Sequence, residues 1–268
     1  MATPIGNLRD ITLRALDVLA QADLILAEDT RVTAKLLAAY DLKKRLERYD
    51  EHAAERARPR ALAALADGAR IALVSDAGTP LISDPGYRLV REAIGQGGAV
   101  IPIPGASASL AALSVAGLPT DRFLFAGFPP HKALARRTFL AELAPAHASL
   151  VFFEGAARLG ASLADMAAVF GPREAVVARE LTKLHETLAR GPLDQLAADP
   201  ALQAPKGEVV VVVAPGAEAP ASAEDADQAL REALTRLGPA EAASEVAGAL
   251  GLSRRDLYRR ALALKGAR

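Results

Sequence analysis

The sequence contains no cysteine, no tryptophan and few other aromatic residues, which together make up 4% of the chain. The absence of cysteine excludes a disulfide scaffold, a cysteine nucleophile and every cysteine-ligated metal site. Four scattered histidines argue against a zinc hydrolase, so we expect no metal. No apolar run reaches the roughly 18 residues of a membrane helix, and the first six residues lack the basic and apolar regions of a signal peptide. These absences favour a cytoplasmic protein with no membrane partner.

What the chain does contain is a large apolar fraction, 51% of its 268 residues, supplied mainly by alanine, leucine and valine. A composition this apolar argues against a disordered chain, and the length predicts one or two domains, each with its own core. Lys and Arg number 32 and so do Asp and Glu, so the formal net charge is zero. This balance argues against a nucleic-acid footprint over the whole surface, but it is compatible with local basic patches.

Short apolar runs alternate with helical patterns in the first part of the chain, which predicts an α/β domain with a mainly parallel sheet. We expect strands at 23–27, 70–74 and 99–103, and helices at 12–21, 54–67 and 87–96. A break at Gly117–Thr120 marks the end of this part.

A second set of strands and helices follows, and then a purely helical region. The expected strands are 123–127, 149–153, 174–178 and 208–214, and the expected helices are 136–143, 159–169, 224–237, 239–250 and 253–264. Five consecutive valines, Val209–Val213, are typical of a strand buried on both faces. With a Pro/Ala/Gly linker at 215–220, the predicted domains are an N-terminal α/β domain (1–117), a C-terminal α/β domain (118–215) and a helical module (221–268).

Two loops rich in small residues follow predicted strands, at 75–80 and at 104–109. In an open α/β sheet, ligands bind at the carboxyl ends of the strands, and small residues let a ligand approach the backbone. Ordinary turns with a capping side chain would look the same. The chain has no G-x-G-x-x-G and no G-x-x-x-x-G-K-[ST] pattern, so the dinucleotide fingerprint and the P-loop are both absent.

Three charged clusters can serve a site or only the surface. Residues 28–31 follow a predicted strand and offer two carboxylates and an arginine, although a capping cluster explains them equally well. Residues 178–183 repeat this arrangement, with a solvated salt-bridge cluster as the alternative. The basic stretch of Lys132, Arg136 and Arg137 is most simply a solvated face.

The helical module has a dipolar charge distribution. Residues 251–268 carry six basic side chains and one acidic one, a net charge of +5, whereas 215–250 carry seven acidic and two basic ones, a net charge of −5. The spacing of Ala247, Gly251 and Leu257 is typical of a helix-turn-helix, with Ser253 as the cap of its second helix. The open alternatives are a plain helical hairpin and a module that docks on nucleic-acid phosphates.

Taken together and in order, the loops at 3–8, 27–31, 75–80, 84–86, 104–105, 117–119 and 178–183 closely resemble the tetrapyrrole methylase family, and in particular its branch that methylates ribosomal RNA. The resemblance covers about residues 2–214. It implies two α/β domains with S-adenosylmethionine in the cleft between them, and a homodimer. It implies 2′-O-methylation of the ribose of a decoding-region cytidine in the 16S ribosomal RNA of the small subunit. The alternatives are a tetrapyrrole C-methyltransferase and a non-enzymatic RNA-binding assembly factor.

The resemblance also implies roles for individual residues. Cofactor contacts are expected at Pro4, Asp76, Ala77, Gly78, Thr79, Pro80, Ile82, Pro104, Gly105, Ala106, Ser107, Ala108, Glu154, Leu181, Lys206 and Gly207. Substrate contacts are expected at Asn7, Glu28, Asp29, Thr30, Arg31, Lys132, Arg136, Arg137, Arg179 and Lys183, and in the helical module at Arg254, Arg255, Arg259 and Arg260. A ribose hydroxyl needs a general base or a polarising cation, for which Asp76, Glu28, Asp29, Glu154 and Lys183 are candidates that the sequence alone does not separate.

The chain departs from the family pattern at three places. Porphyrinoid-methylating relatives have Gly-Asp-Pro where this chain has Asp76–Pro80, which favours the RNA branch. After the position of Glu154 that branch usually has Ser and then His-Arg, whereas here only Arg158 remains, so no histidine there can be the base. The family has a full strand before residue 3, and we therefore expect translation to start upstream of Met1.

Overall fold

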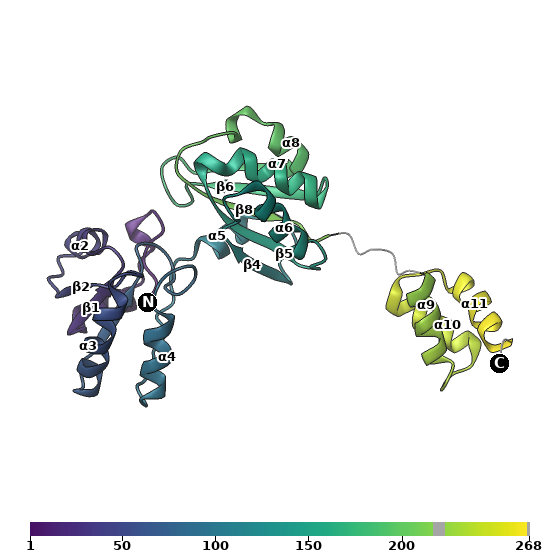
Figure 1. Cartoon of the computed structure of the whole chain (residues 1–268), viewed down its shortest axis with the longest axis horizontal. Coiled ribbons are helices and arrows are strands. Elements are labelled where there is room, and N and C mark those ends of the chain that lie inside the picture. The colour runs from purple at the N-terminus through teal and green to yellow at the C-terminus, as the bar shows by residue number, and fades with distance from the viewer. Residues whose placement is uncertain (217–222, 267–268) are drawn as a thin grey trace. The chain divides into compact units, whose positions relative to one another are not determined.

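The computed structural model describes residues 1–216 and 223–266 (Figure 1). The chain forms two compact units, Met1–Pro215 and Gly216–Arg268. The predicted linker at 215–220 lies mostly outside the described residues, as does the charge of Arg268. No helix in the described ranges is long and apolar enough to span a membrane.

The first half of the larger unit contains a parallel sheet of three strands in the order β2-β1-β3. The strands are β1 (Leu24–Ala27), β2 (Leu46–Arg48) and β3 (Ile71–Val74), and the helices are α1 (Leu13–Gln21), α2 (Thr30–Ala39), α3 (Ala54–Ala66) and α4 (Tyr87–Gly95). All four residues of β1 are buried because it is the central strand. The sequence patterns predict β1, β3, α1, α3 and α4 but not the intervening α2 and β2.

The strand expected at 99–103 does not form, so that prediction was wrong. Ala2 N donates to Ile103 O at 3.1 Å, while on the other side the Met1 ammonium donates to Leu73 O at 2.7 Å. Residues 1–3 thus lie between this apolar segment and β3. The hydrogen bonds described here do not extend into a ladder, and without a strand partner the segment stays irregular, with Val100 and Ile101 exposed.

The second half contains a mixed sheet of five strands in the order β4-β5-β8-β6-β7. The strands are β4 (Phe123–Gly127), β5 (Ser149–Gly155), β6 (Glu174–Arg179), β7 (Thr187–Pro192) and β8 (Glu208–Val213). Only β4 and β5 pair in parallel among these strands; the other pairs are antiparallel. The helices are α5 (Ala108–Ala116), α6 (Ala133–Leu143), α7 (Leu159–Phe170) and α8 (Leu193–Ala198).

Strand β8 lies in the middle of this sheet, and its alternate valines enter two different cores. Val209, Val211 and Val213 pack in the cluster that contains residues of α6, α7 and α8. Val210 and Val212 pack in the cluster that contains α5. The prediction of a strand buried on both faces is confirmed, and the sheet is covered by helices on both sides (Figure 1).

The smaller unit is a three-helix module of α9 (Ala223–Ala233), α10 (Pro239–Leu250) and α11 (Arg254–Gly266). Leu230, Val246 and Leu257 are buried in its core. Gly251 ends α10 in the left-handed conformation with φ 62°, and α11 begins three residues later. This α10–turn–α11 hairpin is the arrangement that the sequence spacing predicts.

Candidate active site

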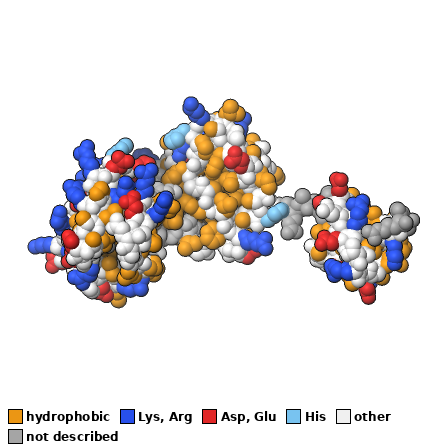
Figure 2. All heavy atoms as spheres, turned by 60° about the horizontal axis from the view of Figure 1, so that its bottom comes forward, with side chains coloured by type: hydrophobic (Ala, Val, Ile, Leu, Met, Phe, Trp, Pro, Cys, Tyr) orange, Lys and Arg blue, Asp and Glu red, His pale blue; other side chains and the backbone are white. Residues whose placement is uncertain are grey.

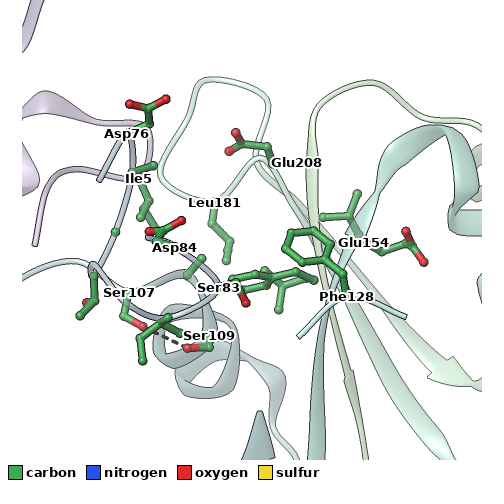
Figure 3. Close-up of a pocket in the computed structure, with 18 of the residues that line it drawn as sticks. Ile5, Asp76, Ser83, Asp84, Ser107, Ser109, Phe128, Glu154, Leu181 and Glu208 are labelled. Carbon is green, nitrogen blue, oxygen red and sulfur yellow. Dashed lines mark hydrogen bonds between the residues drawn. The ribbon is translucent and has the colours of Figure 1, made fainter. Parts of the chain in front are cut away.

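A cavity of about 490 Å³ lies in the larger unit between residues of its two halves. This volume is in the range of small-molecule sites. The first wall comes from Ile5, Glu28, the loop after β3 and the start of α5, and the second wall comes from β4, β5, β6 and β8 and the loops that follow or precede them (Figure 3). Because parallel strands end at one edge of a sheet, β1 and β3 deliver Glu28 and the 76–84 loop to the same wall.

The loop after β3 has an unusual backbone. Gly78 has φ +76°, and the non-glycine residues Leu81 and Ser83 have φ 72° and 64°. On the second wall, Glu180 and Thr182, which flank Leu181, have φ 53° and 66°. Left-handed backbone in such residues costs of order 1–3 kcal/mol each and tends to cluster at functional sites. Both strained segments contribute to the cavity.

Three carboxylates, Glu28, Asp76 and Asp84, line the first wall. Burial, followed by the charges of Asp84 and Asp76, raises the pKa of Glu28. Burial also raises the pKa of Asp84, with the Asp76 charge acting in the same direction and a hydrogen bond from Ser75 opposing it. Asp76 Oδ1 accepts a hydrogen bond from Asp29 N at 2.8 Å, which joins the ends of β1 and β3. The first wall is therefore acidic, and two of its three carboxyl groups have a raised pKa.

The second wall is mainly apolar. Phe128 and Phe153 meet edge to face with their ring centroids 5.6 Å apart, and Leu181 and Val210 also reach the cavity. Figure 3 shows Phe128 and Leu181 directed into the space between the walls, whereas the Glu154 carboxylate points away from it. The cavity thus combines one acidic wall and one apolar wall.

Glu154 is buried, and both of its carboxylate oxygens are occupied. Oε1 lies 2.6 Å from Arg158 Nη2 and accepts from Gly155 N at 2.7 Å, and Oε2 accepts from the Ser162 hydroxyl. A carboxylate with this set of partners and this orientation is structural. Glu154 therefore lines the cavity without being a base, and the retained Arg158 is its partner.

Asp29 and Lys183 are also held by partners. Asp29 caps α2 by accepting from Arg31 N, and the Arg31 guanidinium lies 2.5 Å from its other oxygen, so that these Arg31 hydrogen bonds lower the pKa of Asp29 to about 2. Lys183 Nζ lies 2.9 Å from both Glu180 Oε1 and Glu208 Oε2. Although burial opposes the charged form, these two carboxylates raise the pKa of Lys183. Neither side chain is suited to take a proton at neutral pH.

The structure brings most of the expected cofactor contacts together. Ten of them line the cavity: Asp76, Ala77, Gly78, Thr79, Ile82, Ser107, Ala108, Glu154, Leu181 and Gly207. Six do not: Pro4, Pro80, Pro104, Gly105, Ala106 and Lys206. A Cβ on Gly105 would lie 2.9 Å from Ala2 Cβ, so this glycine accommodates the N-terminal segment rather than a ligand. We correct the expectation that Gly105 lines the cleft.

Of the expected substrate contacts in the larger unit, Glu28 lines the cavity. Asn7 and Lys183 lie where the two halves meet, since Asn7 N donates to Thr182 Oγ1 at 3.2 Å. Arg179 bonds to Thr187 and to the Lys206 carbonyl. Thr30, Arg31, Lys132 and Arg137 lie outside the cavity lining.

Arg136 corrects the expectation of a basic surface stretch. Its side chain is buried, with Nη2 2.6 Å from Asp165 Oδ2, and its Nη1 donates to the carbonyl groups of Pro130 and His131. It cannot reach a substrate because it holds the 130–131 loop on α7. Arg137 on the same helix is exposed and shares Asp165.

The sequence reasoning missed about half of the lining. Ile5, Ser83, Asp84, Ser109, Phe128, Phe153, Gly155, Ala178, Glu208, Val209 and Val210 were not assigned to the site. Asp84 lies in the Asp84-Pro85-Gly86 motif, so a signal for it was present. The valines and phenylalanines read only as core residues, because nothing in the strand pattern tells which face borders a cavity.

In the smaller unit the arginines differ from one another. Arg260 is partly buried and pairs with Asp227 at 2.8 Å, which ties α11 to α9. Arg259 pairs with Asp256 in its own helix. Arg254 and Arg255 are exposed at the start of α11 and form no ion pair with a described residue. Arg260 is therefore a structural residue, which corrects its assignment to substrate binding.

Two sheets in one compact unit, with a ligand-sized cavity in which an acidic loop wall faces an apolar sheet wall, define the class of this protein: an α/β protein with two sheets that border one cavity. Solved structures share this fold. The uroporphyrin-III-C-methyltransferase from Thermus thermophilus matches with TM-score 0.56 and 23% identity, covering 78% of this chain and 90% of that one. The methyltransferase CobJ matches with TM-score 0.58 and 20% identity, covering 79% and 91%.

Sequence comparison is more specific. Residues 2–197 match the family of Tetrapyrrole (Corrin/Porphyrin) Methylases, and residues 220–265 match the RsmI C-terminal HTH domain. The protein named ribosomal RNA small subunit methyltransferase I is 50% identical in Mesorhizobium japonicum, covering 99% of this chain and 91% of the relative. The protein of that name in Erythrobacter litoralis is 54% identical, covering 99% and 94%. The chain belongs to the tetrapyrrole methylase family and, within it, to the ribosomal RNA small subunit methyltransferase I family.

Proposed function

We propose that this chain transfers the methyl group of S-adenosylmethionine to the ribose 2′-hydroxyl of a decoding-region cytidine in 16S ribosomal RNA. Its family membership supports methyl transfer to small-subunit ribosomal RNA. The observation that carries the reaction type is the cavity itself, where an acidic wall with a carboxyl group of raised pKa faces an apolar wall. This arrangement suits a cationic, partly aromatic cofactor and a hydroxyl nucleophile.

The residues of the cavity fit S-adenosylmethionine by their chemistry. Carboxylates of the first wall can accept from amino and hydroxyl groups and complement a positive charge, while the small residues Gly78 and Ala108 leave the backbone accessible. Phe128, Val209 and the other apolar residues of the second wall suit an aromatic base. When bound, the cofactor supplies an electrophilic methyl group.

The chain's own contribution is to align the 2′-oxygen with that methyl group, exclude water and remove the hydroxyl proton. Correct positioning supplies ~7–11 kcal/mol of barrier reduction in favourable systems. Of the five candidates for the base, Asp29, Glu154 and Lys183 are held by partners, which leaves Glu28 and Asp76, with Asp84 beside them. We assign the role to Glu28 because it lines the cavity, has no ion-pair partner among the described residues, and has a pKa raised by burial and by the nearby Asp84 and Asp76 charges, which makes it a stronger base.

We further propose that the protein acts in the cytoplasm as a homodimer. The domain boundary expected at 117/118 is better placed before α5, because α5 packs on the second sheet. Exposed apolar side chains support a second copy: Leu110 and Val115 on α5, and Phe123 and Leu124 on β4. Figure 2 shows hydrophobic side chains gathered over the body that contains the second sheet. Monomers seldom expose large apolar patches. Light scattering should give twice the chain mass for the wild type and a lower mass for Phe123→Asp.

The helical module supports a role in docking rather than in chemistry. Arg254, Arg255 and Arg259 are exposed on α11, and Tyr258 of the same helix is exposed as well. Arginine next to an exposed aromatic ring is suited to phosphate contact and base stacking in RNA. We propose that this face of α11 contacts the ribosomal RNA.

The test is methyl transfer from labelled S-adenosylmethionine to two acceptors, small ribosomal subunits that lack the modification and a porphyrinogen. We expect label in the 16S RNA, at a ribose, and none in the porphyrinogen. Label in the porphyrinogen alone would favour a tetrapyrrole methylase. Calorimetry that detects no cofactor binding would favour an assembly factor without catalysis.

A further inference from the structure

A second hollow, of about 480 Å³, lies at the carboxyl end of β2, apart from the cavity described above. Its charged lining consists of three arginines, one histidine and two carboxylates: Arg48, Arg56, Arg60, His52, Glu47 and Asp50. We call it the β2 groove. It belongs to the first half of the larger unit, where Figure 2 shows many Lys and Arg side chains at the surface.

The carboxylates of the β2 groove lie below its arginines. The side chains of Glu47 and Asp50 are 19% and 16% exposed, whereas their partners Arg60 and Arg48 are 69% and 68% exposed. Arg60 Nη2 lies 2.5 Å from Glu47 Oε1, and Arg48 pairs with Asp50. Each guanidinium has five N–H donors, so a single carboxylate leaves most of them for another acceptor. The acids fix the positions of the arginines without using their binding capacity.

Asp50 is also fixed by the backbone. Its Oδ1 accepts from Ala53 N at 2.7 Å, and this hydrogen bond, followed by the Arg48 contact, lowers the pKa of Asp50. The tether to Arg48 therefore stays charged at neutral pH. The third arginine, Arg56, is exposed one turn before Arg60 on α3 and forms no ion pair with a described residue.

Stability does not explain this arrangement, because exposed ion pairs contribute only about 0–1 kcal/mol. Packing does not explain it either, since the arginine side chains named above extend into solvent. Guanidinium groups that are exposed, preorganised and still have free donors match the geometry of phosphate oxygens.

The β2 groove lies beside the active-site cavity at the same edge of the sheet. Tyr49 N, just after β2, donates to Ala27 O at the end of β1 at 2.7 Å. The residue that directly follows β1 is Glu28, which lines the active-site cavity. Neighbouring strands are ~4.8 Å apart, so the end of β2 is roughly 10 Å from the end of β3 and its Asp76 loop. The charge of Arg48 is near enough to act on Asp29.

We propose that the β2 groove binds the phosphodiester backbone of the RNA next to the target nucleotide, with Arg48, Arg56 and Arg60 as the phosphate contacts. This inference rests on the proposed function, since it requires an RNA substrate. Phosphate contacts fix the register of a protein on a nucleic acid without reading sequence. By holding the RNA backbone where it passes over β1, the groove would determine which ribose of the RNA reaches Glu28.

The test compares Arg56→Ala/Arg60→Ala with a matched control, Arg70→Ala/Arg91→Ala. Arg70 precedes β3 and so lies at the opposite edge of the same sheet, and both control arginines are exposed. Each double variant removes two positive charges from the same half of the larger unit. The protein used is the full chain, with small ribosomal subunits as the acceptor and S-adenosylmethionine calorimetry as the check of folding.

For the test pair we expect KM for subunits to rise roughly tenfold or more, with kcat and cofactor affinity unchanged. The salt dependence of subunit binding should fall by roughly 1.4 in the log–log slope, about 0.7 for each lost phosphate contact. The control pair should change neither quantity by a comparable amount. Arg56→Lys/Arg60→Lys should recover most of the salt slope and only part of the affinity.

Equal effects of the two double variants would overturn the proposal, because they would show a general charge effect. Unchanged KM and slope in the test pair would overturn it as well. A wild-type chain that methylates no RNA would instead count against the proposed function. Direct binding of 16S RNA would then test the role of the β2 groove. That role is contradicted if the test pair binds the RNA with the wild-type salt slope.

Discussion

The carboxylates on the two walls of the cavity differ in whether they form ion pairs. On the first wall, Glu28, Asp76 and Asp84 form no ion pair with a described residue. On the second wall, Glu154 is paired with Arg158, and Glu208 shares Lys183 with Glu180. Charge that is neutralised by a partner builds structure, while charge left without one is available to a ligand. We therefore assign the proton chemistry to the first wall and the shaping of the cavity to the second.

Loss of the paired and buried carboxylate of Glu154 should have the largest effect on the stability of the fold. Glu154→Ala leaves Arg158 without its partner and the Ser162 hydroxyl without its acceptor, at a site where the Glu154 side chain is fully buried. Breaking a buried pair in this way costs about 3–5 kcal/mol. Urea denaturation should show this loss for Glu154→Ala and at most about 1 kcal/mol for the exposed Glu208→Ala. Equal losses of unfolding free energy in the two variants would contradict the distinction between the buried, paired Glu154 and the exposed Glu208.

The helical module offers the same contrast between tied and free charge. Arg254→Ala/Arg255→Ala should reduce the slope of log affinity for subunits against log salt by roughly 1.4 to 1.8, with cofactor affinity unchanged. Arg260→Ala removes the partner of Asp227 and should instead destabilise the module by about 1 kcal/mol. Filter binding at several salt concentrations measures the slope. An Arg260→Ala slope as low as that of the double variant would contradict our division of the arginines.

A smaller effect is expected on the pH profile. The charge of Asp84, after burial, helps to raise the pKa of Glu28. Asp84→Asn removes that charge, so the pKa of Glu28 should fall and the acid limb of kcat against pH should move to lower pH. The rate measured from pH 4 to pH 8 tests this shift. An acid limb at the wild-type pH, or one moved upward, would exclude coupling between these carboxylates.

The smallest effect concerns stability against pH. Because the folded-state pKa of Asp84 is raised, its contribution to stability is present below the unfolded pKa and is lost as pH rises through the folded value. Asp84→Asn should therefore melt at a higher temperature than the wild type at pH 7, and the difference should shrink as the pH falls below the pKa of an unfolded aspartate. A lower melting temperature at pH 7 would reverse the sign of our electrostatic assignment.

The sequence predicts the first wall better than the second, for a physical reason. Strand ends in a parallel sheet share an edge, so motifs such as Asp76–Pro80 can be placed without knowing the tertiary structure. The second wall depends on contacts between distant segments. Phe128 packs against Phe153, and the loop that follows Phe128 is held by Arg136, which pairs with Asp165, 29 residues further along the chain. Residues 99–103 are apolar enough for a strand but have no ladder partner in the described structure. Local pattern contains no information about any of these partners.

The most direct test of a catalytic first wall is the turnover of Glu28→Gln, measured with small ribosomal subunits at saturating S-adenosylmethionine. General-base catalysis contributes about 10²- to 10⁴-fold, so kcat should fall by that factor while cofactor affinity and KM for subunits stay near the wild-type values. The remaining activity should lose the acid limb that Glu28 gives to the wild-type profile. A Glu28→Gln variant with wild-type kcat and an unchanged acid limb would contradict the assignment of proton chemistry to this wall.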